Sequence, residues 1–269
     1  MKPDGLGDSY LIAKLAWHWA RAGHRITVGP IDTLDPALDL AVLHVDRTRV
    51  DPGLVPANPA ARPFLNGRVL DITKRSFSTA RVVRGDDWDG AVIVKSNLNY
   101  YGNLEWGGRP HGFLEEKRRA LARSHWRLAR MLPPSTYPVL PNVSAVPGWV
   151  WRDPELIVER FLPEREGDLY CLRGWVFFGA RGYTFRLFST QKVVKVTSIV
   201  GHEFLGAPPA ELVEFRRLHG WDFGKFDYVE VDGRPVLLDI NKTPTISTGP
   251  DTPRLHDLAG GLEEFLGKP

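Results

Sequence analysis

The segment that most restricts the fold lies near the C-terminus, at residues 223–240. Two strand-like runs of β-branched and aromatic residues, 223–231 and 235–240, flank the dipeptide Asp232-Gly233. An Asp-Gly pair between two such runs is typical of a β-hairpin, because both residues tolerate the positive φ that its tight turn requires. The sequence therefore predicts an antiparallel hairpin in this part of the chain.

The hairpin carries three polar side chains on its apolar strands. Side chains two residues apart on a strand share a face, so Asp239 and Asn241 project together, and Asp227 on the first strand can lie opposite them. Two carboxylates and a carboxamide are oxygen ligands that suit a hard cation such as Mg²⁺. The alternative is a hairpin whose acids face water, which is our interpretation of Glu230 and Asp232.

The remaining chain mixes single helices with runs of neighbouring strands. Helical spacing of apolar residues predicts helices over 11–20, 113–131, 209–219 and 255–266. Strand-like runs occupy 25–29, 40–45, 91–94, 156–162, 170–178, 183–188 and 193–200. Residues 51–66, which are rich in Pro, Ala and Asn, have the composition of a linker. This arrangement indicates an α+β fold, not a parallel barrel or a Rossmann domain.

Composition narrows the class of protein further. The 269 residues are 43% hydrophobic and 25% charged, which is ordinary for a globular chain. No apolar run reaches the length of a membrane span, and the polar N-terminus does not resemble a signal peptide, so we expect a cytoplasmic protein without a membrane partner. The single cysteine, Cys171, cannot form an internal disulfide. The net charge of +3, from 35 basic and 32 acidic residues, is too small to indicate nucleic-acid binding.

The hairpin resembles the C-terminal signature of the ATP-grasp superfamily. In that family an Asp, followed about a dozen residues later by an acid-x-Asn, holds the Mg²⁺ of MgATP. Asp227 and the sequence Asp239-Ile240-Asn241 match this pattern, with an aspartate where the family usually has a glutamate. The resemblance implies that Asp227, Asp239 and Asn241 are metal ligands and that the cofactors are ATP and Mg²⁺.

Two lysines match the phosphate-binding positions of the family. Lys95 ends the apolar run 92–94 and precedes the polar segment 96–108, which contains three glycines. An ammonium group at a strand end can meet nucleotide phosphates, and the backbone N–H groups of such a loop can cover them. Lys74 matches an earlier phosphate-binding lysine of the family, and Arg75 is the other candidate for that position. The alternative for Lys95 alone is a surface lysine whose stem packs on apolar neighbours.

The run 156–163 resembles the strand that contacts adenine in this family. The resemblance implies that Glu159 and the backbone of Phe161 and Leu162 meet the adenine edge. An acid that binds the ribose normally follows within about ten residues, and Glu166 or Asp168 could serve. A solvated loop is an equally good interpretation of these two acids.

Two arginines lie on neighbouring strand-like runs, at Arg173 and Arg186. Their placement resembles the branch of the superfamily that contains glutathione synthetase and the ribosomal-protein glutamate ligase. In that branch the matching arginines are catalytic and face the γ-phosphate, the acyl phosphate or the acceptor carboxylate. An unpaired guanidinium among apolar neighbours is costly, which favours such a role. Lys195, on the next run, is a further candidate for phosphate binding.

The polar residues after the second strand occupy positions where the family often contacts the acceptor substrate, and three tryptophans elsewhere flank loops. A polar loop is an equally good interpretation of the charged residues after the second strand. The tryptophans could line a substrate groove. These residues are His44, Asp46, Arg47, Arg49, Trp106, Trp149 and Trp151.

The resemblance covers about residues 65–245 and implies two units. Residues 1–65 would form an N-terminal pre-ATP-grasp α/β lobe. Residues 66–269 would form the ATP-grasp domain, with the nucleotide between two antiparallel sheets.

The implied activity is that of a Mg²⁺-dependent, ADP-forming ligase. A carboxylate on a small molecule or a peptide becomes an acyl phosphate, which an amine or another nucleophile then attacks to form, with an amine, a C–N bond. We expect a monomer or a homodimer. The alternatives are an ATP-grasp phosphotransferase and a regulatory protein that binds nucleotide with a decayed catalytic site.

Overall fold

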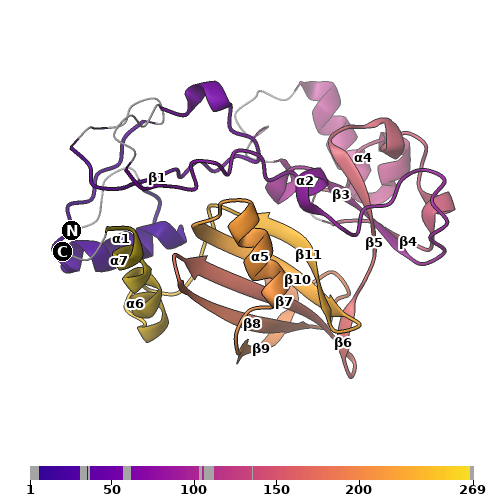
Figure 1. The fold of residues 1–269 in the computed structure, drawn as a ribbon. Helices are drawn as coiled ribbons and strands as arrows, with labels where there is room; N and C mark the ends of the chain where they lie inside the picture. Colours follow the sequence, from indigo (N-terminus) through magenta and orange to yellow (C-terminus); the bar gives the residue numbers. More distant parts are fainter. Residues whose placement is uncertain are drawn as a thin grey trace.

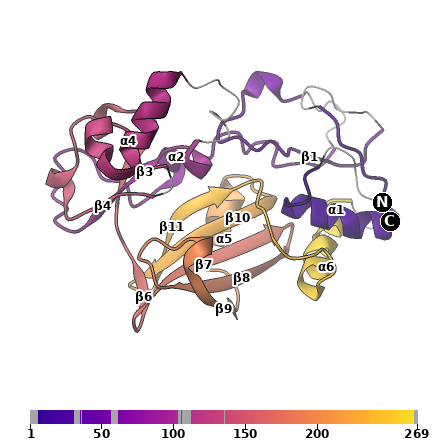
Figure 2. The same cartoon turned by 180° about the vertical axis from the view of Figure 1, so that it is seen from behind.

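The computed structural model describes residues 6–30, 35, 37–56, 62–102, 105, 112–134 and 136–266. It contains a six-stranded and a three-stranded antiparallel sheet, together with a two-stranded parallel pair. Figures 1 and 2 show the large sheet in the lower middle of the molecule. The small sheet lies at one end of it, and the helices α1 and α6 lie at the other end. The predicted α+β class with two antiparallel sheets is confirmed.

The large sheet is formed by the C-terminal half of the chain. Its strands are β6 (Glu164–Glu166), β7 (Leu169–Phe178), β8 (Arg181–Ser189), β9 (Ile199–Leu205), β10 (Phe223–Val231) and β11 (Arg234–Asn241). They lie in the order β11-β10-β7-β8-β9, and β6 pairs with the start of β7. The predicted hairpin is confirmed as β10 and β11, and its turn residues have positive φ, 50° at Asp232 and 74° at Gly233.

The two faces of the large sheet have different coverings. Helix α5 (Ala210–Leu218) packs through Leu212 against an aromatic core that includes Phe226 and Tyr228. On the opposite face, helices α1 (Leu11–Arg21) and α6 (Pro253–Ala259) cover Phe178 and Phe223 at one end of the strands. The rest of this second face, which we call the cleft face, carries the polar part of the hairpin.

A register shift in the hairpin keeps its polar and apolar side chains apart. Asp227 pairs with Asp239, but the next residue, Tyr228, pairs with Leu237, so Leu238 is the extra residue of a β-bulge. The bulge lets Leu237 and Ile240, three residues apart, both join the core under α5.

The small sheet consists of β3 (Val92–Ser96), β4 (Val139–Leu140) and β5 (Leu156–Arg160), in the order β4-β3-β5. Val92, Val94 and Val158 belong to a core that also includes residues of the 3-10 turns η3 (Val143–Ala145) and η4 (Val150–Arg152). Helix α4 (Phe113–Ala129) contributes Trp126 to the same side. Alternation along the strands therefore places Ile93 and Lys95 on the other side of the sheet.

The N-terminal segment is built into the rest of the molecule. Strands β1 (Ala41–Val42) and β2 (Phe64–Leu65) pair in parallel, with the 3-10 turn η1 (Pro52–Leu54) between them. Helix α1 shares a core with α6, and the indole N–H of Trp19 donates to the carbonyl of Ala259 at 2.8 Å. Asn66 follows β2 and bonds through its amide to the backbone of Asp222 and Phe223. These contacts join the two ends of the chain.

Three sequence-based expectations differ from the structure. Residues 25–29 form no strand and are mostly exposed. The run 193–200 contains the 3-10 turn η5 (Val196–Ser198), and strand β9 follows it. The expected helix over 255–266 is divided into α6, η6 (Gly260–Leu262) and α7 (Glu263–Leu266). Gly261 lies so close to the carbonyl of Phe178 that a side chain would not fit there.

No helix in the described part of the chain has both the length and the apolar character needed to cross a bilayer.

Candidate active site

The centre of the site is the pair of carboxylates on the hairpin. Asp227 and Asp239 lie directly opposite each other, and Lys225 lies opposite Asn241. Because Phe226 and Tyr228 point into the core under α5, strand alternation places Lys225 and Asp227 on the cleft face. The ammonium nitrogen of Lys225 is 2.9 Å from Oδ1 of Asp227. The predicted convergence of the two aspartates is confirmed.

The pKa of Asp227 reflects its burial and the charged groups around it. Burial raises the pKa of Asp227, the facing carboxylate of Asp239 raises it further, and Lys225 and Lys74 act in the opposite direction. Two facing carboxylates and the Asn241 amide oxygen form an all-oxygen donor set that fits Mg²⁺. Among the described residues, no group of three or more His, Cys, Asp or Glu side chains is arranged to hold a metal.

Lys74 connects the hairpin to the small sheet. It begins the short helix α2 (Lys74–Phe77), and its side chain is only 3% exposed. Its ammonium nitrogen lies 3.2 Å from Oδ1 of Asp239 and 3.4 Å from the carbonyl oxygen of Leu98, in the loop after β3. The predicted phosphate lysine therefore lies beside the predicted metal ligands.

Lys95 and Glu159 form a second buried pair on the small sheet. The ammonium nitrogen of Lys95 is 2.7 Å from Oε2 of Glu159, and their side chains are 10% and 1% exposed. The two residues that were predicted to contact phosphate and adenine thus lie together. The backbone N–H of Phe161 donates to the carbonyl of Ala91 at 2.9 Å, so this group is already used within the protein. Leu162 follows it and is half-buried.

The pKa of Tyr137 depends on its burial and on acidic groups from both sheets. Burial raises its pKa well above the ordinary value, and Asp239 of the large sheet, Tyr101 and Glu159 of the small sheet act in the same direction. Its ring stacks on that of Tyr101 at a centroid distance of 4.3 Å. Acids from both sheets therefore influence one phenol. Neither tyrosine was identified from sequence, because only the folded chain brings them between the sheets.

The structure places Arg173 and Arg186 on the face of the large sheet opposite to the cleft face. They pair with each other across β7 and β8, and Arg173 also lies opposite Tyr228, which is buried under α5. Their neighbour Gly174 lies opposite Asp227 on the cleft face. The structure therefore does not bring the two predicted catalytic arginines together with the predicted metal ligands.

Both arginines are held by carboxylates. The Nε of Arg173 donates to both oxygens of Glu164 at 2.9 and 3.0 Å, and an Nη contacts Glu230 at 2.8 Å. Arg186 donates through Nε to Glu203 at 2.7 Å and also contacts Glu166. This network satisfies the guanidinium groups without any ligand.

The remaining predicted nucleotide contacts lie at the edges of the large sheet. Asp168 is fully exposed at the turn between β6 and β7, and Glu166 is occupied with Arg186. Lys195 is half-buried at the start of η5. Much of the loop expected over phosphate, including residues 103–104 and 106–108, lies outside the described residues, as does Trp106.

A further cluster joins the N-terminal segment to the metal motif. Asp46 accepts hydrogen bonds from the hydroxyl groups of Tyr10 at 2.6 Å and Thr243 at 2.7 Å. The backbone N–H of Thr243 donates to Oδ1 of Asn241 at 2.8 Å. The ring of His44 packs edge-on against Tyr10, and burial lowers its pKa to about 4. The predicted acceptor contacts His44 and Asp46 thus lie next to Asn241.

The other two residues of that prediction lie away from the cluster. Arg47 is exposed, and Arg49 pairs with Glu155 at 3.1 Å.

Two lysines of the site were not identified from sequence. Lys225 precedes Asp227 by two residues, so strand alternation was the signal that could have placed it on the same face. Lys242 is only 1% exposed and donates to the carbonyl of Val69 at 3.2 Å. Burial lowers the pKa of Lys242 to about 8. Its place directly after Asn241 was the available signal.

Two antiparallel sheets, with a lysine-bearing strand in one and an aspartate-bearing hairpin in the other, are the arrangement that the sequence resemblance to the ATP-grasp superfamily implies. No protein-family model matches the sequence, and no curated protein matches it.

Three solved structures with a similar backbone fold are the following. One is a RimK domain ATP-grasp protein from Sphaerobacter thermophilus, with 14% identity and a TM-score of 0.48, over 98% of this chain and 96% of that chain. Another is the D-alanine–D-alanine ligase of Bacillus anthracis, with 11% identity and a TM-score of 0.43, over 91% and 86%. The third is the macrocyclase MdnC from Microcystis aeruginosa, bound with the precursor peptide MdnA, with 11% identity and a TM-score of 0.35, over 64% and 47%.

Proposed function

We propose that the protein is an ATP-dependent ligase that activates a carboxylate as an acyl phosphate and joins it to an amine or another nucleophile. The observation that carries this proposal is the meeting of Lys74 with Asp239. It places a cation suited to phosphate beside oxygen ligands suited to Mg²⁺. The buried Lys95–Glu159 pair extends the same cleft along the small sheet.

The hairpin supplies the metal site in this proposal. Asp227, Asp239 and Asn241 would hold Mg²⁺, and their oxygen donors fit that ion. When bound, the ion would offset the charge of the nucleotide phosphates. Lys225 and Lys74 lie 2.9 and 3.2 Å from Asp227 and Asp239 and partly neutralise these two carboxylates.

The protein's own residues would position and neutralise the reacting groups. The substrate carboxylate attacks the γ-phosphorus, and the bond to the bridging oxygen of ADP breaks. The amine nitrogen then attacks the acyl carbon, phosphate leaves, and the nitrogen loses a proton. Phosphoryl transfer depends mainly on position and charge, which Lys74, Lys95 and Lys225 provide on the cleft side. The proposed acceptor pocket is the cluster of His44 and Asp46 beside Asn241.

Arg173 and Arg186 lie on the other face of the large sheet, so this geometry does not support their predicted catalytic role. Phe161, Leu162, Asp168 and Lys195 remain predicted nucleotide contacts. Because carboxylates already pair with both arginines, we propose Lys225 as the cation that contacts the transferred phosphate. A cytoplasmic monomer or homodimer without nucleic-acid or membrane partners remains part of the proposal.

Isosteric removal of one charge tests the metal site. Asp239→Asn keeps the shape of the side chain, and Asp232→Asn makes the same change at the exposed turn of the same hairpin. We expect Asp239→Asn to lower ATP turnover by at least about a hundredfold, the size of effect typical for a lost electrostatic contact to the transferring group. Asp232→Asn should stay within about twofold of the wild type.

Turnover is measured as ADP release with pooled carboxylates and amines, and mass spectrometry identifies the product. Full turnover in Asp239→Asn would remove the metal assignment. An amide product supports the ligase, and a stable phosphorylated product would favour a phosphotransferase. Nucleotide binding without any ADP release would favour a regulatory protein.

A further inference from the structure

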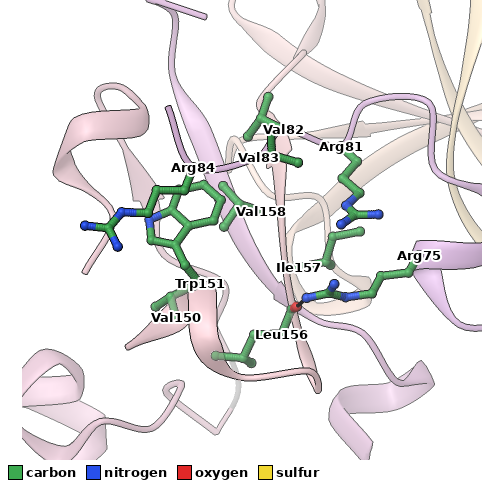
Figure 3. Close-up of a pocket in the computed structure, with 10 residues that line it drawn as sticks. All are labelled: Arg75, Arg81, Val82, Val83, Arg84, Val150, Trp151, Leu156, Ile157 and Val158. Atoms are coloured by element: carbon green, nitrogen blue, oxygen red, sulfur yellow. Dashed lines mark hydrogen bonds between the residues drawn. The ribbon is translucent and has the colours of Figure 1, made fainter. Parts of the chain in front are cut away.

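A hollow of about 120 Å³ lies beside β5, at the edge of the small sheet. Figure 3 shows the residues that line it, which come from the segment before β3, from η4 and from β5. Arg75, which the sequence offered as a rival to Lys74 for phosphate, lines this hollow, and none of the residues proposed above to bind nucleotide or metal does.

The floor of the hollow is aliphatic. Val82, Val150, Leu156 and Val158 line it and are buried in the core of the small sheet. Val83 remains 52% exposed at its rim. Because engineered apolar cavities of about 150 Å³ hold a benzene molecule, this hollow has room for one aliphatic side chain.

Three arginines surround the aliphatic floor. Arg75 and Arg81 point toward each other on one side, and Arg84 comes from the other side, near Trp151, with its guanidinium directed outward (Figure 3). Arg75 donates to the carbonyl of Leu156 at 2.7 Å. Burial lowers its pKa, the charge of Arg81 lowers it further, and Asp153 and Glu155 act in the opposite direction.

The positive charges of the three arginines are not neutralised by any acidic residue in the lining of the hollow. No carboxylate lines it, and within the described part of the chain neither Arg81 nor Arg84 forms an ion pair. Guanidinium groups match carboxylates in geometry and charge, so an acidic ligand would relieve the repulsion between Arg75 and Arg81.

A neighbouring hollow has the opposite charge. It measures about 590 Å³, shares Arg84 and Trp151 with the first, and is lined by Asp86, Asp87 and Asp89. A long polyanion such as RNA would meet these three aspartates after passing the arginines. A short ligand with a local negative charge could contact the arginines without reaching these aspartates.

We propose that the arginine-lined hollow binds a short acidic segment of a peptide, with an aliphatic side chain on its floor and flanking carboxylates on Arg75, Arg81 and Arg84. The site goes beyond the ligase activity proposed above and does not depend on it. It would hold an acidic segment of a protein partner outside the nucleotide site.

The test uses a fluorescein-labelled peptide of alternating glutamate and leucine, followed by fluorescence anisotropy with the full-length protein. The double variant Arg81→Glu/Arg84→Glu reverses two exposed charges at the rim. The matched control, Arg181→Glu/Arg217→Glu, makes the same change at two exposed arginines elsewhere. Thermal unfolding confirms that both variants fold.

We expect the rim variant to weaken binding by about tenfold or more and the control to change it by less than about twofold. A peptide with glycine in place of leucine, or lysine in place of glutamate, should bind at least about tenfold more weakly. Equal binding of the rim variant, equal binding of either altered peptide, tighter binding of oligouridylate, or no binding of the probe up to about 1 mM would each overturn the proposal.

Discussion

Replacing Lys225 by methionine tests the electrostatic role of this lysine. Among the cations proposed for the site, Lys225 is the one that shares a strand with a predicted metal ligand, Asp227. Methionine retains much of the apolar stem but removes the charge 2.9 Å from Oδ1 of Asp227. The two side chains are 26% and 19% exposed, so the pair is partly screened by solvent. Breaking a fully buried pair costs about 3–5 kcal/mol, and we expect about 1–3 kcal/mol of lost unfolding free energy here.

The effect of this substitution should depend on pH with a defined sign. Burial and Asp239 already raise the pKa of Asp227 in the folded state, and loss of Lys225 would raise it further. A carboxyl group whose folded pKa lies above its unfolded value destabilises the protein once it ionises. The variant should therefore approach wild-type stability near pH 4 and lose stability as the pH rises through the folded pKa of Asp227.

Urea unfolding between pH 4 and 8 measures this prediction, with Lys192→Met as a control at an exposed lysine. Lys225→Arg should restore most of the stability because it restores the charge. Added Mg²⁺ should stabilise Lys225→Met more than the wild type, because the cation no longer competes with an ammonium group. A variant with wild-type stability and a wild-type pH profile would refute the assigned role of Lys225.

Two further predictions concern packing and pH. Gly174→Ala should cost about 1–3 kcal/mol of unfolding free energy, because the ring of Phe185 lies directly over Gly174, and Phe185→Leu should recover part of the loss in the double variant. Additive losses in that pair would contradict the proposed contact. His44 has a pKa of about 4 in the folded protein, so stability should fall by about 2–3 kcal/mol as the pH drops from 6.5 toward 4, where only the unfolded chain takes up the proton. His44→Gln should flatten this slope in urea unfolding, and an unchanged slope would contradict the assignment.

The hairpin was predictable because its information is local. Asp232 and Gly233 specify the turn, and the position of the turn brings Asp227 opposite Asp239. Helix α4 and most strands of the large sheet were predictable for the same reason, since their periodicity is contained within each segment.

The partners of Arg173 depend on information that is not local. Whether it shares a face with Asp227 is decided by the register between β7 and β10, and a shift of one residue reverses every side chain. The structure pairs Gly174 with Asp227, which sends Arg173 to the other face. Lys74 likewise meets Asp239, and the charge of Asp239 likewise acts on Tyr137, only through the packing of the two sheets.

The position of Lys74 has a consequence for the order of events in the cleft. Its ammonium group lies against Asp239 and competes with a metal ion for that carboxylate. Under the proposed function, an arriving phosphate would offer Lys74 a second anion and free Asp239 for the metal. Each ligand would then strengthen the binding of the other, and this coupling must be equal in both directions. One buried lysine would thereby make nucleotide and Mg²⁺ bind as a cooperative unit.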